Sequence, residues 1–282
     1  MGVSVVDWLA EAEIKLKASG IKSYRSDARG LLKYVAELDD QQIIFGDIKL
    51  NADRATKLNY LLDRRSAGEP LAYILGFKDF FGHNFMVDNR VLIPRPETEN
   101  LVEYILSLNL KQPRIIDVGT GSGIIGLSLA LAIPESKIIL ADNQNSALEV
   151  VLKNKNKFID QLKISGSSVE IIKSNLLNNI TEQKFNIIVA NLPYVDRTWA
   201  WINIHDLSFE PSSALFADDS GLSLIKRLIT QSAAYMRSYS YLILEVDPSQ
   251  RQAIEQFAKT HNFNICNTEP YGDYLLALKL ND

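Results

Sequence analysis

Apolar side chains recur at helical spacing through the first 75 residues. Two series carry the pattern: Val5, Trp8, Leu9, Ala12 and Leu16, and then Ala28, Leu31, Leu32 and Val35. Residues three and four apart share one face of a helix, so each series predicts a helix with one buried side. Ser26 and Asn51 stand in N-cap positions, and Gly68 and Pro70 end the third long segment at about residue 67. The pattern predicts a small helical-bundle domain over residues 1–75.

The pattern changes to that of a β-hairpin at residues 76–95. Aromatic and β-branched residues lie on both sides of the turn signal Gly82-His83-Asn84. Pro94 and Pro96 then interrupt the chain before helical spacing returns in LVEYILSL at 101–108. These features predict a hairpin linker between two domains, with the second domain beginning near residue 96.

From residue 114 onward, short apolar runs alternate with helical segments. The runs are RIIDV, KIILAD, VEIIK, FNIIVAN, YLILEV and YLLALKL. This alternation is typical of an α/β domain in which most strands of the sheet are parallel. We therefore expect an α/β domain over residues 96–282.

Composition narrows the class of protein. A chain of 282 residues with 46% hydrophobic and 23% charged residues is expected to be globular, with two domains. No apolar stretch approaches the ~20 residues that cross a bilayer, and no signal pattern opens the chain, so a cytoplasmic location is expected.

One cysteine and three scattered histidines leave no metal-ligand spacing, so no metal is expected. The net charge of −4 disfavours nucleic acid as a partner.

A glycine-rich loop follows the first strand of the α/β domain. It reads Gly119-Thr120-Gly121-Ser122-Gly123, and an apolar helix begins near Ile124. Glycines allow the backbone to approach a ligand closely, beside the partly positive N-terminus of the helix. This arrangement indicates a nucleotide-type cofactor site. The glycine spacing also fits a dinucleotide-binding motif that includes Gly126, so NAD has to be considered as the cofactor.

Asp142 ends the second strand, KIILAD, at the edge of the sheet where ligands bind. A carboxylate at this place accepts hydrogen bonds from the two ribose hydroxyls of a bound nucleoside. The alternative is a helix N-cap for the segment that starts near Ser146. We favour the ribose role because Asp142 follows an apolar strand at the carboxyl edge of the sheet.

The fourth strand, FNIIVA, leads into Asn191-Leu192-Pro193-Tyr194 at the same edge. An amide nitrogen is a weak nucleophile because its lone pair is delocalised, so its methylation requires exact positioning. In this interpretation the side-chain oxygen of Asn191 and the backbone carbonyl of Leu192 each accept one N–H. Pro193 stiffens the loop and Tyr194 packs against the acceptor. An ordinary proline turn is the alternative, but with the glycine loop the motif predicts a methyltransferase for planar nitrogen, whereas NAD enzymes do not need it.

Over nearly its whole length the chain resembles the release-factor glutamine methyltransferases, the PrmC/HemK family. The segments that carry this resemblance are VLIPRPETENLVE at 91–103, DVGTGSGIIGLSLA at 117–130, NLPY at 191–194, FEPSSAL at 209–215, Ser220-Gly221-Leu222 and LILEV at 242–246. The first of these is the most specific, because glycine loops and Asn-Pro-Pro-Tyr loops occur in many methyltransferases.

The resemblance implies a Rossmann-like, seven-stranded class I methyltransferase domain, preceded by a helical domain and a hairpin linker. It implies S-adenosyl-L-methionine as cofactor and, as substrate, the glutamine of the Gly-Gly-Gln loop of class I peptide chain release factors, methylated on its side-chain nitrogen N5. By position, residues 119–123 line the cofactor site, Asp142 binds ribose, Asn191 touches cofactor and glutamine, and residues 192–194 complete the glutamine pocket. We expect a monomer whose helical domain docks the release factor, without membrane or nucleic-acid partners.

Two positions depart from the family pattern. Asn175-Leu176 stands where the family has Asp-Trp near the end of the third strand. Asn175 still offers a hydrogen bond to adenine, but the aromatic wall is absent, so weaker or differently shaped cofactor binding is predicted. Leu192 replaces the first proline of the acceptor loop, which costs stiffness and leaves the backbone carbonyl in place.

Three alternatives use the same motifs. The substrate is a ribosomal-protein glutamine in the first and adenine N6 of a nucleic acid in the second, because that exocyclic amine is also planar. The adenine alternative requires a basic face beside the loop and binding that weakens steeply with salt. The third is a non-catalytic binding protein, and only Leu192 favours it.

Overall fold

The computed structural model describes residues 2–181, 184–199 and 207–281. These residues form two compact units, Met1–Phe77 and Lys78–Asp282. Each unit has its own hydrophobic core and is described here by itself.

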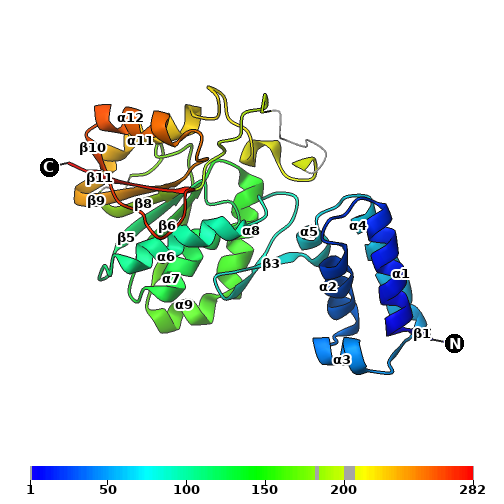
Figure 1. Ribbon diagram of the computed structural model, residues 1–282. Helices are drawn as coiled ribbons and strands as arrows, with labels where there is room; N and C mark the ends of the chain where they lie inside the picture. Colours follow the sequence, from blue (N-terminus) through cyan, green and yellow to red (C-terminus); the bar gives the residue numbers. More distant parts are fainter. Residues whose placement is uncertain (1, 182–183, 200–206, 282) are drawn as a thin grey trace. The chain divides into compact units, whose positions relative to one another are not determined.

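The first unit is a small helical bundle (Figure 1). Its elements are β1 (Val3–Ser4), α1 (Val5–Ala18), α2 (Tyr24–Ala36), α3 (Asp40–Phe45), β2 (Lys49–Leu50), α4 (Ala52–Ser66) and α5 (Leu71–Leu75). The two short strands pair antiparallel. The apolar series of the sequence form the core: Trp8 and Leu16 of α1 pack with Leu31 and Leu32 of α2. Trp8 Nε1 also donates to Asn59 Oδ1 over 2.9 Å, which ties α1 to α4.

One of the two N-cap predictions in this unit is right and the other is wrong. Asn51 caps α4, with its side-chain oxygen accepting from Arg54 N at 2.8 Å. Ser26 lies inside α2, which begins at Tyr24 after Ser23. The hydroxyl of Ser26 donates to the carbonyl of Ser23 at 2.9 Å, so it bonds back along the chain instead of capping the helix.

A β-hairpin opens the second unit. Strands β3 (Phe77–Phe80) and β4 (His83–Met86) flank a turn at Phe81 and Gly82, whose φ angles are +47° and +73°. Positive φ at both central residues is what a tight two-residue hairpin turn requires. The turn therefore lies one to two residues before the predicted Gly82-His83-Asn84, and His83 and Asn84 belong to β4.

A seven-stranded mixed sheet forms the centre of the second unit, which confirms the expected fold class. Its strands are β5 (Arg114–Val118), β6 (Lys137–Asp142), β7 (Ser168–Lys173), β8 (Phe185–Ala190), β9 (Met236–Glu245), β10 (Phe263–Ile265) and β11 (Leu275–Leu280). The order is β10-β11-β9-β8-β5-β6-β7. Strand β11 runs antiparallel to β9 and β10, and the other neighbouring pairs are parallel. Six apolar runs predict six of these strands, and the three-residue β10 is the strand of this sheet that the sequence pattern does not predict.

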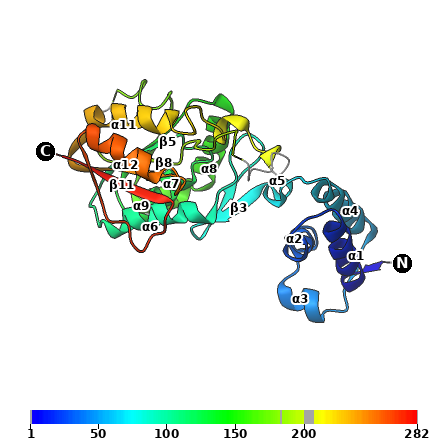
Figure 2. The same cartoon turned by 45° about the horizontal axis from the view of Figure 1, so that its top comes forward.

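Alternating strand residues build two cores, one on each face of the sheet. Ile116 of β5 faces the core shared with α11 (Ser223–Tyr235) and α12 (Arg251–Thr260), whereas Ile115 faces the opposite core. That opposite face is covered by α6 (Glu99–Ser107), α7 (Ile124–Ala132), α8 (Asn145–Lys157) and α9 (Ile159–Ser165). Figures 1 and 2 show these two helical layers with the strands between them. Both faces are buried, which explains why the strands read as continuous apolar runs.

Candidate active site

The glycine loop joins the carboxyl end of β5 to α7. Its start is held by Ala141 of the neighbouring strand β6, whose carbonyl accepts from the backbone N–H groups of Gly119 at 2.8 Å and Thr120 at 3.0 Å. Gly119, Gly121 and Gly123 have φ angles of +72°, +57° and +84°, a region that other residues enter at a cost. Space is open where a Cβ of Gly121 would lie. The loop therefore presents bare backbone to a cleft at this edge of the sheet.

Asp117 supports the loop from below. Its Oδ2 accepts from Thr120 Oγ1 at 2.6 Å and from Gly126 N at 3.0 Å. Its Oδ1 is buried and has no hydrogen-bond partner within the part of the chain that the structure describes. Burial raises the pKa of the carboxyl to about 6, against the opposing effect of the bonds from Thr120 and Gly126. Asp117 is thus a buried acid that is held by two donors and is costly to ionise.

We predict that Asp117 makes the folded protein less stable as pH rises from about 4 to about 6. In this window the folded state holds a proton that the unfolded state has released, so the free energy of unfolding falls as pH rises. Asp117→Asn removes this effect, and its stability relative to wild type should rise by about 1–3 kcal/mol across the window. Urea denaturation at several pH values measures it, with the exposed Asp160→Asn as control for the loss of one charge. Parallel curves for wild type and Asp117→Asn would contradict the prediction.

Asp142 lies at the end of β6, beside the loop. Its Oδ2 accepts from Gly121 N at 3.0 Å and its Oδ1 from Gln144 N at 2.9 Å. The backbone N–H of Asn143 also bonds to this carboxylate. Its two oxygens have four lone pairs in total, so at least one acceptor site is left for a ligand. Burial raises the pKa of Asp142, and the backbone N–H bonds oppose that shift. Gln144 is the N-cap of α8, so the carboxylate of Asp142 bonds just before the helix and does not occupy the cap position.

One cleft brings together most of the predicted site residues. Its lining includes Thr98, Gly119, Thr120, Gly121, Ser122, Asp142, Asn175, Leu176, Asn191, Leu192 and Pro193. The space between these atoms is about 940 Å³, open solvent at the mouth included. Ligand pockets usually hold about 300–1,000 Å³. Gly123 and Tyr194 do not line the cleft: Gly123 caps α7, and Tyr194 packs against the core under α11 and α12.

The acceptor loop is bonded to Thr98 and, through it, to Glu245, two residues that no sequence motif marks as functional. Asn191 Nδ2 donates to Thr98 Oγ1 at 3.3 Å, and Thr98 Oγ1 donates to Glu245 Oε2 at 2.6 Å. The hydroxyl of Tyr194 donates to Glu245 Oε1 at 3.2 Å. Burial raises the pKa of both Glu245 and Tyr194, and their proximity raises that of Tyr194 further. Thr98 lies in the PRPETE segment and Glu245 in LILEV. Both segments carry the family resemblance, but neither predicts these contacts from the sequence alone.

Gln250 and Gly221 hold the loop from behind. Gln250 Nε2 donates to the carbonyls of Tyr194 at 2.8 Å and Ser220 at 2.7 Å. Gly221 has φ +82°, and a Cβ there would lie 2.0 Å from the carbonyl oxygen of Tyr194. Only glycine fits this approach. The Ser220-Gly221-Leu222 segment therefore has a packing role beside the acceptor loop.

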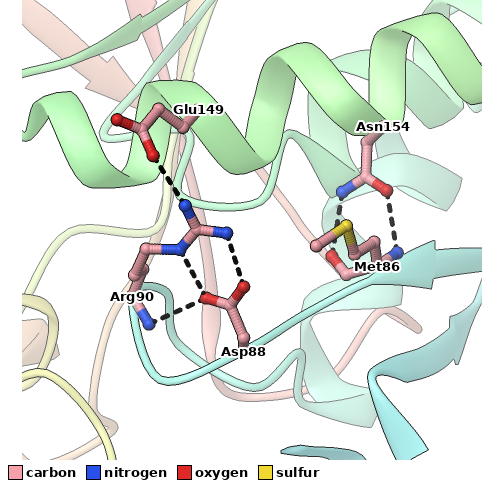
Figure 3. Close-up of polar contacts among 5 residues, drawn as sticks. All are labelled: Met86, Asp88, Arg90, Glu149 and Asn154. Atoms are coloured by element: carbon pink, nitrogen blue, oxygen red, sulfur yellow. Dashed lines mark hydrogen bonds and ion pairs between the residues drawn. The ribbon is translucent and has the colours of Figure 1, made fainter.

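Polar contacts fix the segment after β3 to α8, as Figure 3 shows. Arg90 donates to Asp88 through Nε at 2.8 Å and Nη2 at 2.6 Å, and to Glu149 of α8 through Nη1 at 2.7 Å. Asn154 of α8 accepts from Met86 N at 2.8 Å and donates to Met86 O at 3.0 Å. No motif marks Arg90 or Asn154 in the sequence, because their partners lie on elements distant along the chain.

The two family-pattern departures have well-defined surroundings. Asn175 Oδ1 accepts from Arg227 Nη2 at 3.2 Å. Leu176 lines the cleft with 6% of its surface exposed and has φ +52°, a left-handed backbone that is uncommon for leucine. Leu192 is buried too, with its Cδ2 2.8 Å from where a Cβ of Gly119 would lie. Aliphatic side chains thus occupy both places in the cleft wall.

We expect Leu176→Trp to bind the cofactor more tightly, by about 3- to 10-fold, because an aromatic face beside an adenine adds about 0.5–1.5 kcal/mol. Titration calorimetry with S-adenosylmethionine measures the dissociation constant. Leu152→Trp, at an exposed position of α8, controls for the added indole. An unchanged or weaker affinity of Leu176→Trp would show that the absent aromatic wall does not limit binding.

Comparison with solved structures places the fold. The chain matches the Thermus thermophilus 16S rRNA N2 G1207 methyltransferase, solved with AdoMet and guanosine, with a TM-score of 0.52 and 15% identity, over 73% of this chain and 50% of that one. Residues 97–225 match the family described as methyltransferase small domain, and residues 7–76 match the PrmC N-terminal domain. Fold and site together define a methyltransferase of the class I, Rossmann-like type.

Two curated relatives narrow this class. The release factor glutamine methyltransferase of Escherichia coli K12 is 36% identical over 271 residues, which cover 94% of each chain. That of Buchnera aphidicola subsp. Schizaphis graminum is 38% identical over 258 residues, covering 91% of this chain and 90% of the relative. The chain belongs to the release factor glutamine methyltransferase family.

No helix among the described residues is both long and apolar enough to cross a membrane. No group of three or more His, Cys, Asp or Glu side chains in the same residues is arranged to hold a metal ion.

Proposed function

We propose that this protein transfers a methyl group from S-adenosyl-L-methionine to the side-chain amide nitrogen N5 of the glutamine in the Gly-Gly-Gln loop of class I peptide chain release factors. The family membership supports the substrate class. The observation that supports methyl transfer to an amide is the position of the acceptor loop, which follows the carboxyl end of β8 and lies beside the glycine loop after β5. The protein acts as a cytoplasmic monomer in this proposal, and its helical unit docks the release factor.

The cleft fits S-adenosylmethionine. The carboxylate of Asp142 lines the cleft with an acceptor site left for a ribose hydroxyl, and Gly121 leaves open space where another residue would project a side chain. Residues 119–122 would hold the amino-acid portion, and Asn175 and Leu176 the adenine. The cofactor supplies a methyl group on a positively charged sulfur. The chain supplies the position of the nitrogen that receives it.

Two oxygens of the acceptor loop suit a primary amide. No donor to Asn191 Oδ1 or to the backbone carbonyl of Leu192 exists among residues 2–181, 184–199 and 207–281, and both residues line the cleft. If each accepts one N–H of the glutamine, the amide plane is fixed and the lone pair of the nitrogen projects out of it. The amide proton leaves after methylation has made the nitrogen acidic, so no general base is required beforehand. Positioning therefore provides most of the rate acceleration in this mechanism.

The test uses the full-length protein, labelled S-adenosylmethionine and a purified class I release factor. A second sample contains the same release factor with its loop glutamine replaced by alanine. We expect label in the first sample alone. Equal labelling of both would exclude the assigned acceptor, and labelling of a ribosomal protein in a parallel sample in place of the release factor would support the other glutamine substrate.

A further inference from the structure

A buried chain of hydrogen bonds leads from the acceptor loop to the end of β9. It runs from Asn191 Nδ2 to Thr98 Oγ1, and from Thr98 Oγ1 to Glu245 Oε2. Thr98 is 1% exposed and Glu245 is 2% exposed, so bulk water does not replace either bond. The three residues come from three separate segments: the turn Pro96–Thr98 before α6, the loop after β8 and the last position of β9.

This chain of hydrogen bonds has a direction, and Glu245 sets it. An ionised carboxylate accepts hydrogen bonds and has no proton to donate. The hydroxyl of Thr98 has one proton, which the carboxylate takes at 2.6 Å. Towards Asn191 the oxygen of Thr98 can therefore only accept. Burial raises the pKa of Glu245, and the bonds that Thr98 and Tyr194 donate to it oppose that shift, so the direction described here belongs to the ionised carboxyl.

The direction decides which way round the Asn191 amide lies. Only its NH₂ group can bond to an oxygen that accepts, so Oδ1 must take the opposite side. Asn191 is one of the residues that line the cleft, so Oδ1 is the group of this amide that remains for a ligand there. In a flipped amide, Oδ1 would face the Thr98 oxygen, so two acceptors would meet. At the other end, the NH₂ group would face the NH₂ group of the substrate, so two donors would meet.

We propose that Thr98 and Glu245 are positioning residues that lock the Asn191 amide with Oδ1 towards the acceptor nitrogen. Neither touches the reacting atoms in this arrangement, and each acts through Asn191. The inference rests on the proposed function, because the orientation of Oδ1 matters only for an acceptor that has an N–H to donate. Without the lock, both orientations of the amide are populated, and only one of them holds the glutamine.

The test compares Thr98→Val, Thr98→Ser and Glu245→Gln in the full-length protein. Valine keeps the shape of threonine and removes the hydroxyl, whereas serine keeps the hydroxyl. Glutamine in place of Glu245 can donate to Thr98, so Thr98 becomes free to donate to Asn191 and the amide can flip. We expect kcat to fall about 10- to 100-fold in Thr98→Val and Glu245→Gln, with an unchanged cofactor dissociation constant, and to stay within about threefold of wild type in Thr98→Ser. Glu255→Gln on α12 is the matched control for an amide in place of a carboxylate.

A second readout does not depend on turnover. In protein labelled with ¹⁵N-asparagine, the side-chain NH₂ signal of Asn191 is assigned by its absence in Asn191→Ala. Slow exchange of these protons with solvent is expected in wild type and Thr98→Ser, and faster exchange in Thr98→Val. If Thr98→Val does not fold, Glu245→Gln is judged by the same two measurements.

The outcomes separate the two proposals. Normal kcat and slow exchange in Thr98→Val would overturn the lock while wild-type methylation of the release factor leaves the proposed function standing. Lower thermal stability with unchanged kcat in both variants would reduce the network to a structural role and also overturn it. If wild type does not label the release factor, the proposed function fails, and the exchange of the Asn191 amide protons still decides whether the lock exists.

Discussion

Asn191→Ala is expected to lower kcat by about 100- to 1,000-fold and to leave cofactor binding nearly unchanged. The substitution removes Oδ1 of Asn191, a residue that lines the cleft, and this oxygen has no donor among the described residues. Cofactor contacts elsewhere in the cleft, at Asp142 and the glycine loop, stay in place. Single-turnover methylation with the release factor in excess measures the rate, and titration calorimetry measures the cofactor affinity.

A matched substitution tests whether this effect belongs to the site. Asn264 is exposed on β10, at the edge of the sheet, and Asn264→Ala removes the same chemical group there. It should methylate at the wild-type rate. Near-normal turnover of Asn191→Ala would mean that the acceptor is held elsewhere, whereas a large loss in both variants would indicate a general effect on folding.

Asp142→Ala is expected to weaken cofactor binding by about 100-fold, or about 2.7 kcal/mol. Two effects add. The ribose loses a charged acceptor, and Gly121 N loses the carboxylate that holds it at 3.0 Å, so the glycine loop loses part of its shape. Titration calorimetry with S-adenosylmethionine and with its demethylated product checks this, since both share the ribose.

Asp142→Asn separates the two effects on cofactor binding. Its side-chain oxygen can still accept from one backbone N–H, but the charge is gone, so an intermediate affinity is expected. The control is Asp160→Ala, an exposed aspartate of α9 that pairs with Lys163. An affinity of Asp142→Ala close to that of the control would remove Asp142 from the cofactor site.

The sequence predicts the strands well where both faces of the sheet are buried. The runs RIIDV and KIILAD coincide with β5 and β6 because every residue of a doubly covered strand is apolar unless it has a special role. Prediction is poorer where a local hydrogen bond or a pairing with a distant strand decides the structure. Ser26 has the side chain of an N-cap, yet its hydroxyl bonds to Ser23, and the short β10 forms only because β11 provides a partner.

Some residues of the candidate site can be predicted from the sequence pattern, and others cannot. Asp142 and Asn191 stand directly after apolar strands, so their place at the sheet edge follows from the pattern alone. Thr98 and Glu245 are 147 positions apart in the sequence and meet only after the PRPETE segment has packed against the sheet. Neither a period nor a motif specifies such a pair, since a threonine and a glutamate are ordinary residues until they are buried together.

The side chain of Asn154 connects strand β4 to the glycine loop. The same side-chain NH₂ that reaches Met86 O also donates to Ser122 O in the glycine loop, at 2.8 Å. Opening of β4 and disorder of the loop are therefore thermodynamically linked, and a ligand that stabilises one must slow hydrogen exchange in the other. The backbone amide of Met86, which bonds to Asn154, would then report occupancy of a cleft that it does not line.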